Sequence, residues 1–101
     1  MQSISPAELY QKLSDKEDIM LIDVREPEEH KVFNIGGRLI PLPDIMSHAN
    51  EIPQDKPVVL YCKMGIRSKI AIQRLSAKYG FTNLINLTGG MEAWKKVFNG
   101  L

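Results

Sequence analysis

Short apolar segments alternate with helical segments along the whole chain, and this alternation constrains the fold more than any other feature. Strands are predicted at residues 20–24, 39–40, 58–61 and 84–87, and helices at 6–14, 26–30, 44–50, 68–79 and 91–98. Because the strands are almost wholly apolar, both faces of their sheet must be covered. We therefore predict a three-layer α/β domain, in which a mostly parallel sheet of about five short strands has helices on both faces.

Local signals mark the ends of two helices. Ser5 is a predicted N-cap, Pro6 suits the first helical position, and Glu8 completes a capping box. Helical spacing within 68–79 predicts a face that packs on the sheet, made of Ala71, Ile72, Leu75 and Tyr79. Gly80 is a suitable C-terminal stop for this second helix.

Composition narrows the class of protein. A length of 101 residues predicts a single domain over 1–101, and a net charge of +1 gives no electrostatic reason to expect nucleic acid or a membrane as partner. The chain has no apolar stretch of membrane-spanning length and no signal peptide, so we expect a soluble, cytoplasmic protein. With one cysteine and no Cys/His cluster of metal-ligand spacing, we expect neither a disulfide nor a metal site.

Cys62, the only cysteine, lies where a predicted strand meets a predicted helix. A thiolate is favoured near a helix N-terminus and near basic side chains, which Lys63, Arg67 and Lys69 supply. Gly65 allows the intervening backbone to curl and to direct N–H groups at an anion on the sulfur. A lone cysteine at a strand end is also often a small buried core residue. The glycine-containing loop and the basic residues favour a nucleophile over that interpretation.

A second strand ends in polar residues. Asp23 and Arg25 lie at the carboxyl end of the predicted strand 20–24. In parallel α/β sheets, ligands bind beyond the carboxyl ends of the strands. We therefore expect Asp23, Arg25 and Cys62 to approach one pocket.

Three segments of the chain resemble a single-domain rhodanese, a member of the thiosulfate or persulfide sulfurtransferase family. In the family's order, they are Asp23–Glu29 (DVREPEE), Cys62–Ser68 (CKMGIRS) and Gly89–Trp94 (GGMEAW). Asn34–Leu42 also resembles the rhodanese-like domain that ends some adenylyltransferases of molybdenum-cofactor and thiamine biosynthesis. The resemblance covers nearly the whole chain and implies the rhodanese-like fold. It leaves open whether the chain is a whole protein or a domain of a larger one.

The resemblance implies that Cys62 accepts a sulfane sulfur from thiosulfate or a persulfide donor and becomes a cysteine persulfide. It implies a substrate-binding cradle of backbone amides made of Lys63, Met64, Gly65, Ile66, Arg67 and Ser68. Converging N–H donors stabilise the developing negative charge, and no cofactor is expected. Because the chain has no second cysteine, the sulfur must pass to an outside nucleophile, either a small thiol or a sulfur-carrier or other partner protein. The expected reaction is a double displacement.

Two basic residues that are expected near the cysteine, Arg25 and Lys63, each have two possible roles. Arg25 either binds an anionic donor or forms an ion pair with Asp23 or Glu28. Lys63 either stabilises the thiolate or is a solvated charge.

Structural support is expected from residues of the same segments. Asp23 is predicted to order the backbone at the strand end, Gly89 and Gly90 to form a turn, and Trp94 to pack in the core. His30 and His48 are predicted to lie at the surface.

Two positions depart from the family pattern. Members that use thiosulfate often have a second cation two positions after the cysteine, where this chain has Met64. An apolar side chain there favours persulfide or protein donors over thiosulfate. The segment Asn34–Gly37 replaces a commoner form with histidine and proline, which concerns the conformation of that loop and not the chemistry.

Rival functions are of two classes. Cysteine phosphatases and arsenate reductases have a related fold, with five residues between cysteine and arginine, whereas four lie between Cys62 and Arg67. The shorter loop suits a single sulfur better than a tetrahedral phosphate. The other alternative is a non-catalytic or slow sulfur-carrier or docking domain of a larger protein.

Overall fold

Within residues 1–98, which the computed structural model describes, five parallel strands form one sheet in the order β1-β5-β4-β2-β3. The strands are β1 (Gln2–Ile4), β2 (Met20–Asp23), β3 (Arg38–Leu39), β4 (Val58–Tyr61) and β5 (Leu84–Leu87). The last residues of the predicted domain, 99–101, lie outside the described part.

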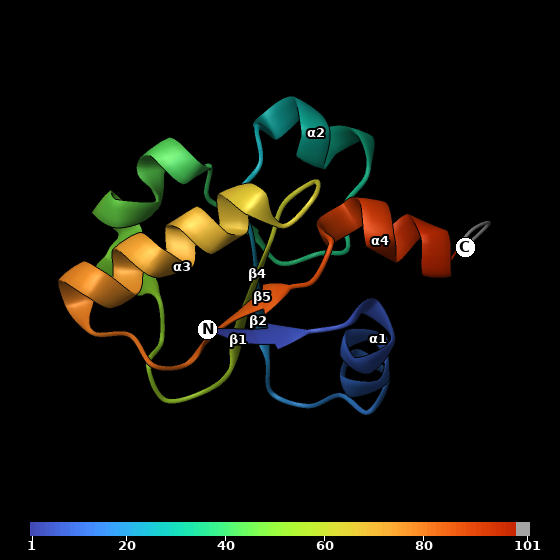
Figure 1. Ribbon diagram of the computed structural model, residues 1–101, viewed down its shortest axis with the longest axis horizontal. Helices are drawn as coiled ribbons and strands as arrows, with labels where there is room; N and C mark the ends of the chain where they lie inside the picture. Colours follow the sequence, from blue (N-terminus) through green and yellow to red (C-terminus); the bar gives the residue numbers. More distant parts are fainter. Residues whose placement is uncertain (99–101) are drawn as a thin grey trace.

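Helices cover both faces of this sheet (Figure 1). They are α1 (Pro6–Ser14), α2 (Pro27–Val32), the 3₁₀-helix η1 (Leu42–Glu51), α3 (Ile66–Tyr79) and α4 (Gly90–Val97). Helices η1 and α3 lie on one face and α1 and α4 on the other, which confirms the predicted three-layer α/β fold. Across residues 1–98, none of the helices combines the length and apolar character needed to cross a membrane.

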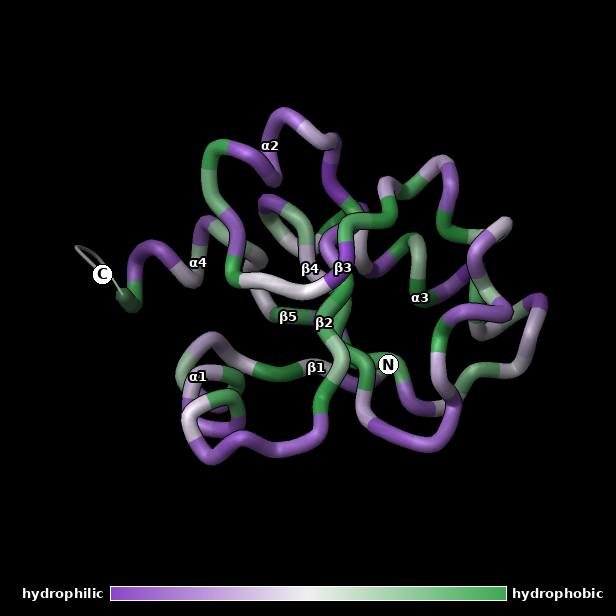
Figure 2. The backbone as a smooth tube through the Cα atoms, turned by 180° about the vertical axis from the view of Figure 1, so that it is seen from behind, coloured by the Kyte–Doolittle hydropathy of each residue, from purple (hydrophilic) through white to green (hydrophobic). Residues whose placement is uncertain are grey.

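Each face of the sheet has its own apolar layer. Leu60 of β4 packs with Leu75 of α3 in one layer, and Leu87 of β5 packs with Leu9 of α1 and Trp94 of α4 in the other. In Figure 2, β2 is coloured as hydrophobic, whereas the connection after α1 is hydrophilic. Full burial of one large apolar side chain stabilises a fold by about 1.5–3 kcal/mol, so these layers hold the helices on the sheet.

The helix-end signals in the sequence are confirmed. The Ser5 hydroxyl accepts the N–H of Glu8 at 3.1 Å, and the Glu8 carboxylate accepts the N–H of Ser5 at 3.1 Å, which is a complete capping box. Gly80 ends α3 in the left-handed conformation, with φ of 73°.

Two elements differ from the predicted pattern in where they begin or whether they form. The strand β1 is not predicted, because two of its three residues are polar and exposed; pairing with β5 makes it a strand. Helix α3 begins at Ile66, two residues before the predicted start, because Gly65 supplies a left-handed N-cap with φ of 92°. Arg67 therefore lies in the first turn of α3.

Two other predictions need correction. The predicted helix at 44–50 is part of the longer 3₁₀-helix η1, which has a proline in its first turn. Tyr79 is 43% exposed and does not pack on the sheet, because it is the last residue of α3 and the buried residues of that helix end at Leu75.

The register of the central strands brings their carboxyl ends level. Asp23 of β2 is paired with Tyr61 of β4, and Leu60 of β4 is paired with Asn86 of β5. Cys62 follows Tyr61 directly and so lies at the edge of the sheet where parallel α/β folds bind ligands.

Candidate active site

The loop after β4 is held by hydrogen bonds to its carbonyl groups. The carbonyl oxygens of Cys62 and Lys63 accept the N–H groups of Met91 and Glu92 at the start of α4, both at 2.9 Å. The Gly65 carbonyl accepts the side-chain amide of Asn86 at 3.3 Å. These hydrogen bonds point the three carbonyl groups outward, toward β5 and α4. The inner side of the loop is therefore left to its N–H groups.

The sulfur of Cys62 lies inside this loop. Its Sγ accepts the N–H of Gly65 at 3.1 Å and the N–H of Ser68 at 3.4 Å, so two amides of the predicted cradle contact it. Cys62 is only 1% exposed, whereas Met64 and Ile66 on the same loop are 53% and 62% exposed. A donor must therefore reach a sulfur that is almost fully buried.

Ser68 lies between the sulfur and a buried amide. Its Oγ is 2.5 Å from Oδ1 of Asn86 and 3.4 Å from Sγ of Cys62. A hydroxyl has one proton, so it donates to one of these acceptors at a time. When Cys62 ionises, its sulfur becomes the charged acceptor and competes with Asn86 for that proton.

These contacts lower the pKa of Cys62. Burial alone raises the pKa of a thiol. Here, hydrogen bonds from the Ser68 side chain and from the N–H groups of Ser68, Gly65 and Met64 outweigh burial, and the pKa of Cys62 falls below its usual range. The site can therefore hold a thiolate without a neighbouring histidine.

Gly90 sets the distance between α4 and the loop. A Cβ at Gly90 would collide with the carbonyl oxygen of Cys62 and with the backbone of Lys63. Its φ of 59° is also a conformation that favours glycine. Gly89 precedes it with φ of 73°, and Trp94 is 9% exposed against the rings of Tyr10 and Phe98. The turn of Gly89 and Gly90 thus contacts the loop directly.

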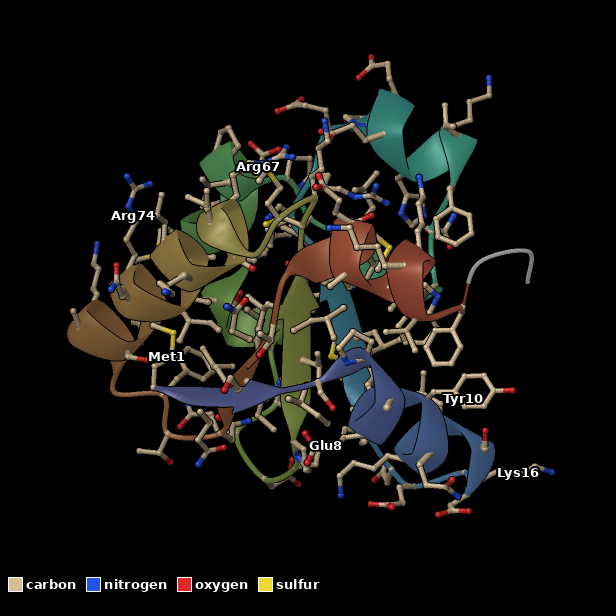
Figure 3. All side chains as sticks on the ribbon, turned by 45° about the vertical axis from the view of Figure 1, so that its right-hand side comes forward. Met1, Glu8, Tyr10, Lys16, Arg67 and Arg74 are labelled. Atoms are coloured by element: carbon tan, nitrogen blue, oxygen red, sulfur yellow. The ribbon has the colours of Figure 1, made fainter. Side chains whose placement is uncertain are left out.

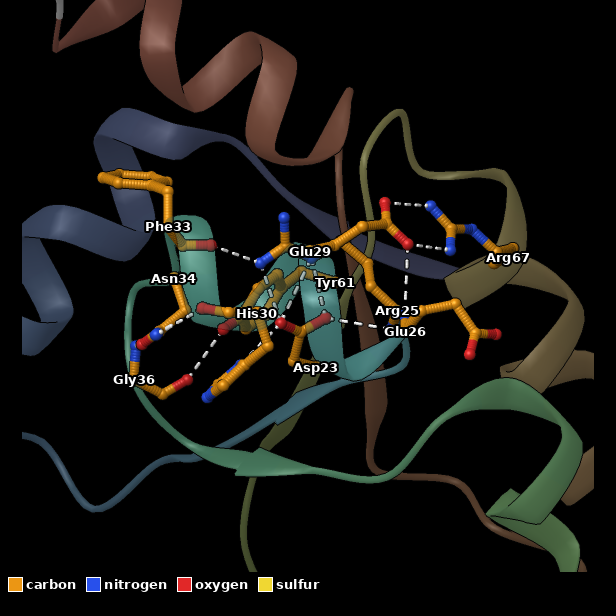
Figure 4. A network of polar contacts seen from close by, with 10 residues as sticks. All are labelled: Asp23, Arg25, Glu26, Glu29, His30, Phe33, Asn34, Gly36, Tyr61 and Arg67. Carbon is orange, nitrogen blue, oxygen red and sulfur yellow. Dashed lines mark hydrogen bonds and ion pairs between the residues drawn. The ribbon is translucent and has the colours of Figure 1, made fainter.

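Arg67 of α3 forms an ion pair with Glu29 of α2. Its guanidinium donates to both oxygens of the Glu29 carboxylate, at 2.7 and 2.9 Å (Figure 4). Hydrogen bonds from Arg67 are the main reason that the pKa of Glu29 falls to about 2. Figure 3 shows Arg67 at the end of α3 nearest to α2, while Arg74 on the same helix lies well away from it.

Arg25 is held by its own ion pair. Its guanidinium donates to both oxygens of Asp23, at 2.8 to 3.1 Å, and to the carbonyl of Phe33 at 2.6 Å. Asp23 also accepts the N–H of Arg25 at 3.0 Å, so it orders the strand end. Arg25 is 4% exposed and forms the predicted ion pair with Asp23, and it also lines a cleft between α2 and α4.

The two histidines are half-buried, whereas Lys63 is exposed. His30 contacts the Asp23 carboxylate at 2.8 Å, so it lies only partly at the surface, where the sequence predicts it (Figure 4). His48 likewise lies only partly at the surface. Lys63 lines the same cleft as Arg25, which has a volume of about 430 Å³. Within residues 1–98, no group of three or more His, Cys, Asp or Glu side chains is arranged to hold a metal ion.

Two residues of this site are not identified from the sequence. Asn86 is a polar residue in an apolar strand, and that contrast is the one signal that marks it. Glu29 reads as one of several acidic residues in a short helix. Only the position of α2 near the start of α3 pairs it with Arg67.

Comparison with known proteins gives a consistent result. The chain matches the rhodanese-like domain family over residues 5–97. It is 41% identical over 97 residues to the probable adenylyltransferase/sulfurtransferase MoeZ of Mycobacterium tuberculosis, which covers 93% of this chain and 24% of MoeZ. It is 37% identical over 97 residues to a sulfurtransferase of Allochromatium vinosum, which covers 95% of this chain and 90% of that protein.

A solved structure agrees with the sequence comparison. The crystal structure of a rhodanese-like domain protein from Staphylococcus aureus has a TM-score of 0.84 and 32% identity, over 93% of this chain and 91% of that one. The chain spans about a quarter of the length of MoeZ, so only the aligned region is compared there. The resemblance found in the three sequence segments is confirmed, and the chain belongs to the rhodanese family.

Proposed function

We propose that this protein is a sulfurtransferase that carries a sulfane sulfur as a persulfide on Cys62. The observation that carries the proposal is the convergence of the Gly65 and Ser68 amides on Sγ of Cys62. Amides aimed at the sulfur stabilise negative charge on it before any donor arrives. Several relatives are named sulfurtransferases, which supports this class of activity.

The reaction is written as two displacements. The Cys62 thiolate attacks the outer sulfur of thiosulfate or of a persulfide donor, and a new sulfur–sulfur bond forms. The sulfur–sulfur bond of the donor breaks, and sulfite or a thiolate leaves with its electron pair. An acceptor nucleophile then attacks the outer sulfur of the persulfide, and the Cys62 thiolate is regenerated.

Each residue of the loop has a proposed part in this cycle. The amides of Lys63, Met64, Gly65, Ile66, Arg67 and Ser68 surround the transferred sulfur. Arg25 keeps the strand end and the loop near it in place through Asp23, and Gly89, Gly90 and Trp94 position α4 behind the loop. The reaction needs no cofactor, because the cysteine and the amides supply the nucleophile and the charge stabilisation.

The proposed partners are a small sulfane-sulfur donor and a thiol acceptor, which in a cell includes a sulfur-carrier or other partner protein. Because Cys62 must return from the persulfide to the thiolate in each cycle, the proposed reaction suits a reducing compartment such as the cytoplasm. The apolar Met64, exposed on the loop, favours a persulfide or protein donor over thiosulfate.

Mass spectrometry of the intact protein tests the proposal. After incubation with a sulfane-sulfur donor, the reduced protein should gain the mass of one sulfur atom and lose it to dithiothreitol. The Cys62→Ser variant should gain nothing. An adduct that survives this substitution, or no adduct with thiosulfate, polysulfide or glutathione persulfide, would defeat the assignment.

A slow sulfur carrier is a second candidate, and the 1% exposure of Cys62 favours it. A carrier should load stoichiometrically but release sulfur slowly to small thiols. Steady-state turnover with cyanide or glutathione as acceptor separates it from the enzyme. Hydrolysis of a phenyl phosphate ester at an enzymatic rate would instead favour a phosphatase.

A further inference from the structure

Glu29 forms an ion pair with Arg67, whose guanidinium is the closest in sequence to the proposed nucleophile Cys62. The two side chains meet in a bidentate contact, and they are 31% and 32% exposed. The Cys62 thiolate is one of the charges that raise the pKa of Arg67, after the larger effect of Glu29, so the guanidinium is within electrostatic reach of the sulfur.

The carboxylate of Glu29 is fixed by its own helix. Its Oε1 accepts the N–H of Glu26 at 3.1 Å, which is part of the capping box at the start of α2. Arg67 holds the same carboxylate from the other side, from α3. Glu29 is therefore an anion already bound at the position where a guanidinium fork would otherwise receive a donor anion.

The effect of the Glu29–Arg67 pair on the reaction rate should depend on the charge of the sulfur donor. When the Cys62 thiolate attacks thiosulfate, the site holds three negative charges: one on the sulfur and two on the donor. Methanethiosulfonate has the same sulfur–sulfonyl bond but one charge, and sulfinate leaves in place of sulfite. Coulomb energy is linear in donor charge, so any fixed charge near the sulfur acts twice as strongly on thiosulfate.

We propose that Glu29 is a specificity-determining residue, which neutralises Arg67 and thereby selects against dianionic sulfur donors. This inference rests on the proposed sulfurtransferase function and adds the class of donor. The apolar Met64 on the same loop acts in the same direction. The site as built is suited to donors of low charge.

The experiment compares Glu29→Gln with Glu28→Gln. Glu28 is an exposed neighbour on α2, so its substitution makes the same change in net charge without altering the Arg67 contact. For Glu29→Gln, we expect kcat/KM to rise on the order of tenfold with thiosulfate and about threefold with methanethiosulfonate. For Glu28→Gln, both donors should change less than about twofold.

A double variant tests whether the rise in kcat/KM with thiosulfate depends on the guanidinium of Arg67. In an Arg67→Met background, adding Glu29→Gln should give a smaller preferential gain with thiosulfate than in the wild-type background, because only the charge of Glu29 is removed there and no guanidinium is freed. Thermal melting checks the fold, and Glu29→Ser replaces the glutamine variant if that variant does not melt cooperatively.

The results separate the inference from the function beneath it. Equal changes with both donors, equal effects of the two glutamine substitutions, or a gain that is undiminished without Arg67 would overturn the role of Glu29 while leaving the sulfurtransferase intact. If the wild-type protein gains no sulfur mass from thiosulfate, polysulfide or glutathione persulfide, the proposed function fails and the inference fails with it.

Discussion

At the scale of single residues, the proposed sulfur transfer depends on the few hydrogen-bond donors that contact the sulfur of Cys62. Sγ of Cys62 contacts two amides and the Ser68 hydroxyl, and that hydroxyl is shared with Asn86. Burial opposes ionisation of the thiol, so each donor that is removed should shift the balance back toward the neutral form.

The Ser68→Ala substitution tests this balance. One side-chain hydrogen bond to the sulfur is lost, so the pKa of Cys62 should rise, and alkylation by iodoacetamide at neutral pH should slow about fivefold for a bond of roughly 1 kcal/mol. The measurement is the alkylation rate against pH. Ser76→Ala, farther along α3, is the matched control and should leave the profile unchanged. A profile that stays in place for Ser68→Ala would show that the hydroxyl does not stabilise the thiolate.

At the scale of elements, the short helix α2 is held at the site by polar contacts of Glu29 with Arg67 and of His30 with Asp23. Helix α2 has six residues, none of them buried, so packing contributes little to its position. Its contact with α3 through Glu29 and Arg67 joins the two helices. A partly exposed bidentate pair of this kind is worth about 1 kcal/mol after solvent screening.

The stability from this pair should depend on pH. The pKa of Glu29 falls from 4.5 to about 2 on folding, so the pair contributes fully above pH 4.5, and its contribution is lost as the pH falls toward 2. Urea unfolding of the wild type and Glu29→Gln should differ by about 1 kcal/mol at pH 7 and converge below pH 4. Glu28→Gln should show no such convergence. A difference that is the same at all pH values would mean that the carboxylate charge is not involved.

At the scale of the whole molecule, the loop takes its shape from elements distant in sequence. The start of α4 holds the carbonyls of Cys62 and Lys63, and Asn86 of β5 holds that of Gly65. The proposed nucleophile, the loop around it and the residues behind it therefore form one packed unit, in which α4 approaches the loop most closely at Gly90.

Two glycine substitutions test how close that approach is. Gly80→Ala places a methyl in open space at a φ of 73°, and should cost about 1 kcal/mol of unfolding free energy. Gly90→Ala adds a collision with the Cys62 carbonyl to similar backbone strain, and should cost roughly 3 kcal/mol and slow persulfide formation. Chemical denaturation and sulfur loading measure the two effects. Equal losses for both variants would show that α4 can move away from the loop.

Much of this architecture is readable in the sequence because it depends on local patterns. Apolar runs such as Val58–Tyr61 predict buried parallel strands, the capping box at Ser5 predicts α1, and Cys62 followed by Gly65 and Arg67 predicts the loop. The strand β1 escapes prediction because its identity depends on pairing with β5 and not on its own residues.

Tertiary structure alone decides which partners the charged and polar side chains find. The sequence places Arg67 five residues after Cys62, but only the position of α2 near the start of α3 pairs its guanidinium with Glu29. Likewise, only the register of β5 against β4 brings Asn86 to Ser68. A chain pattern encodes what each segment buries, whereas an ion pair or a hydrogen bond across 38 residues, as between Glu29 and Arg67, depends on where the completed fold places both ends.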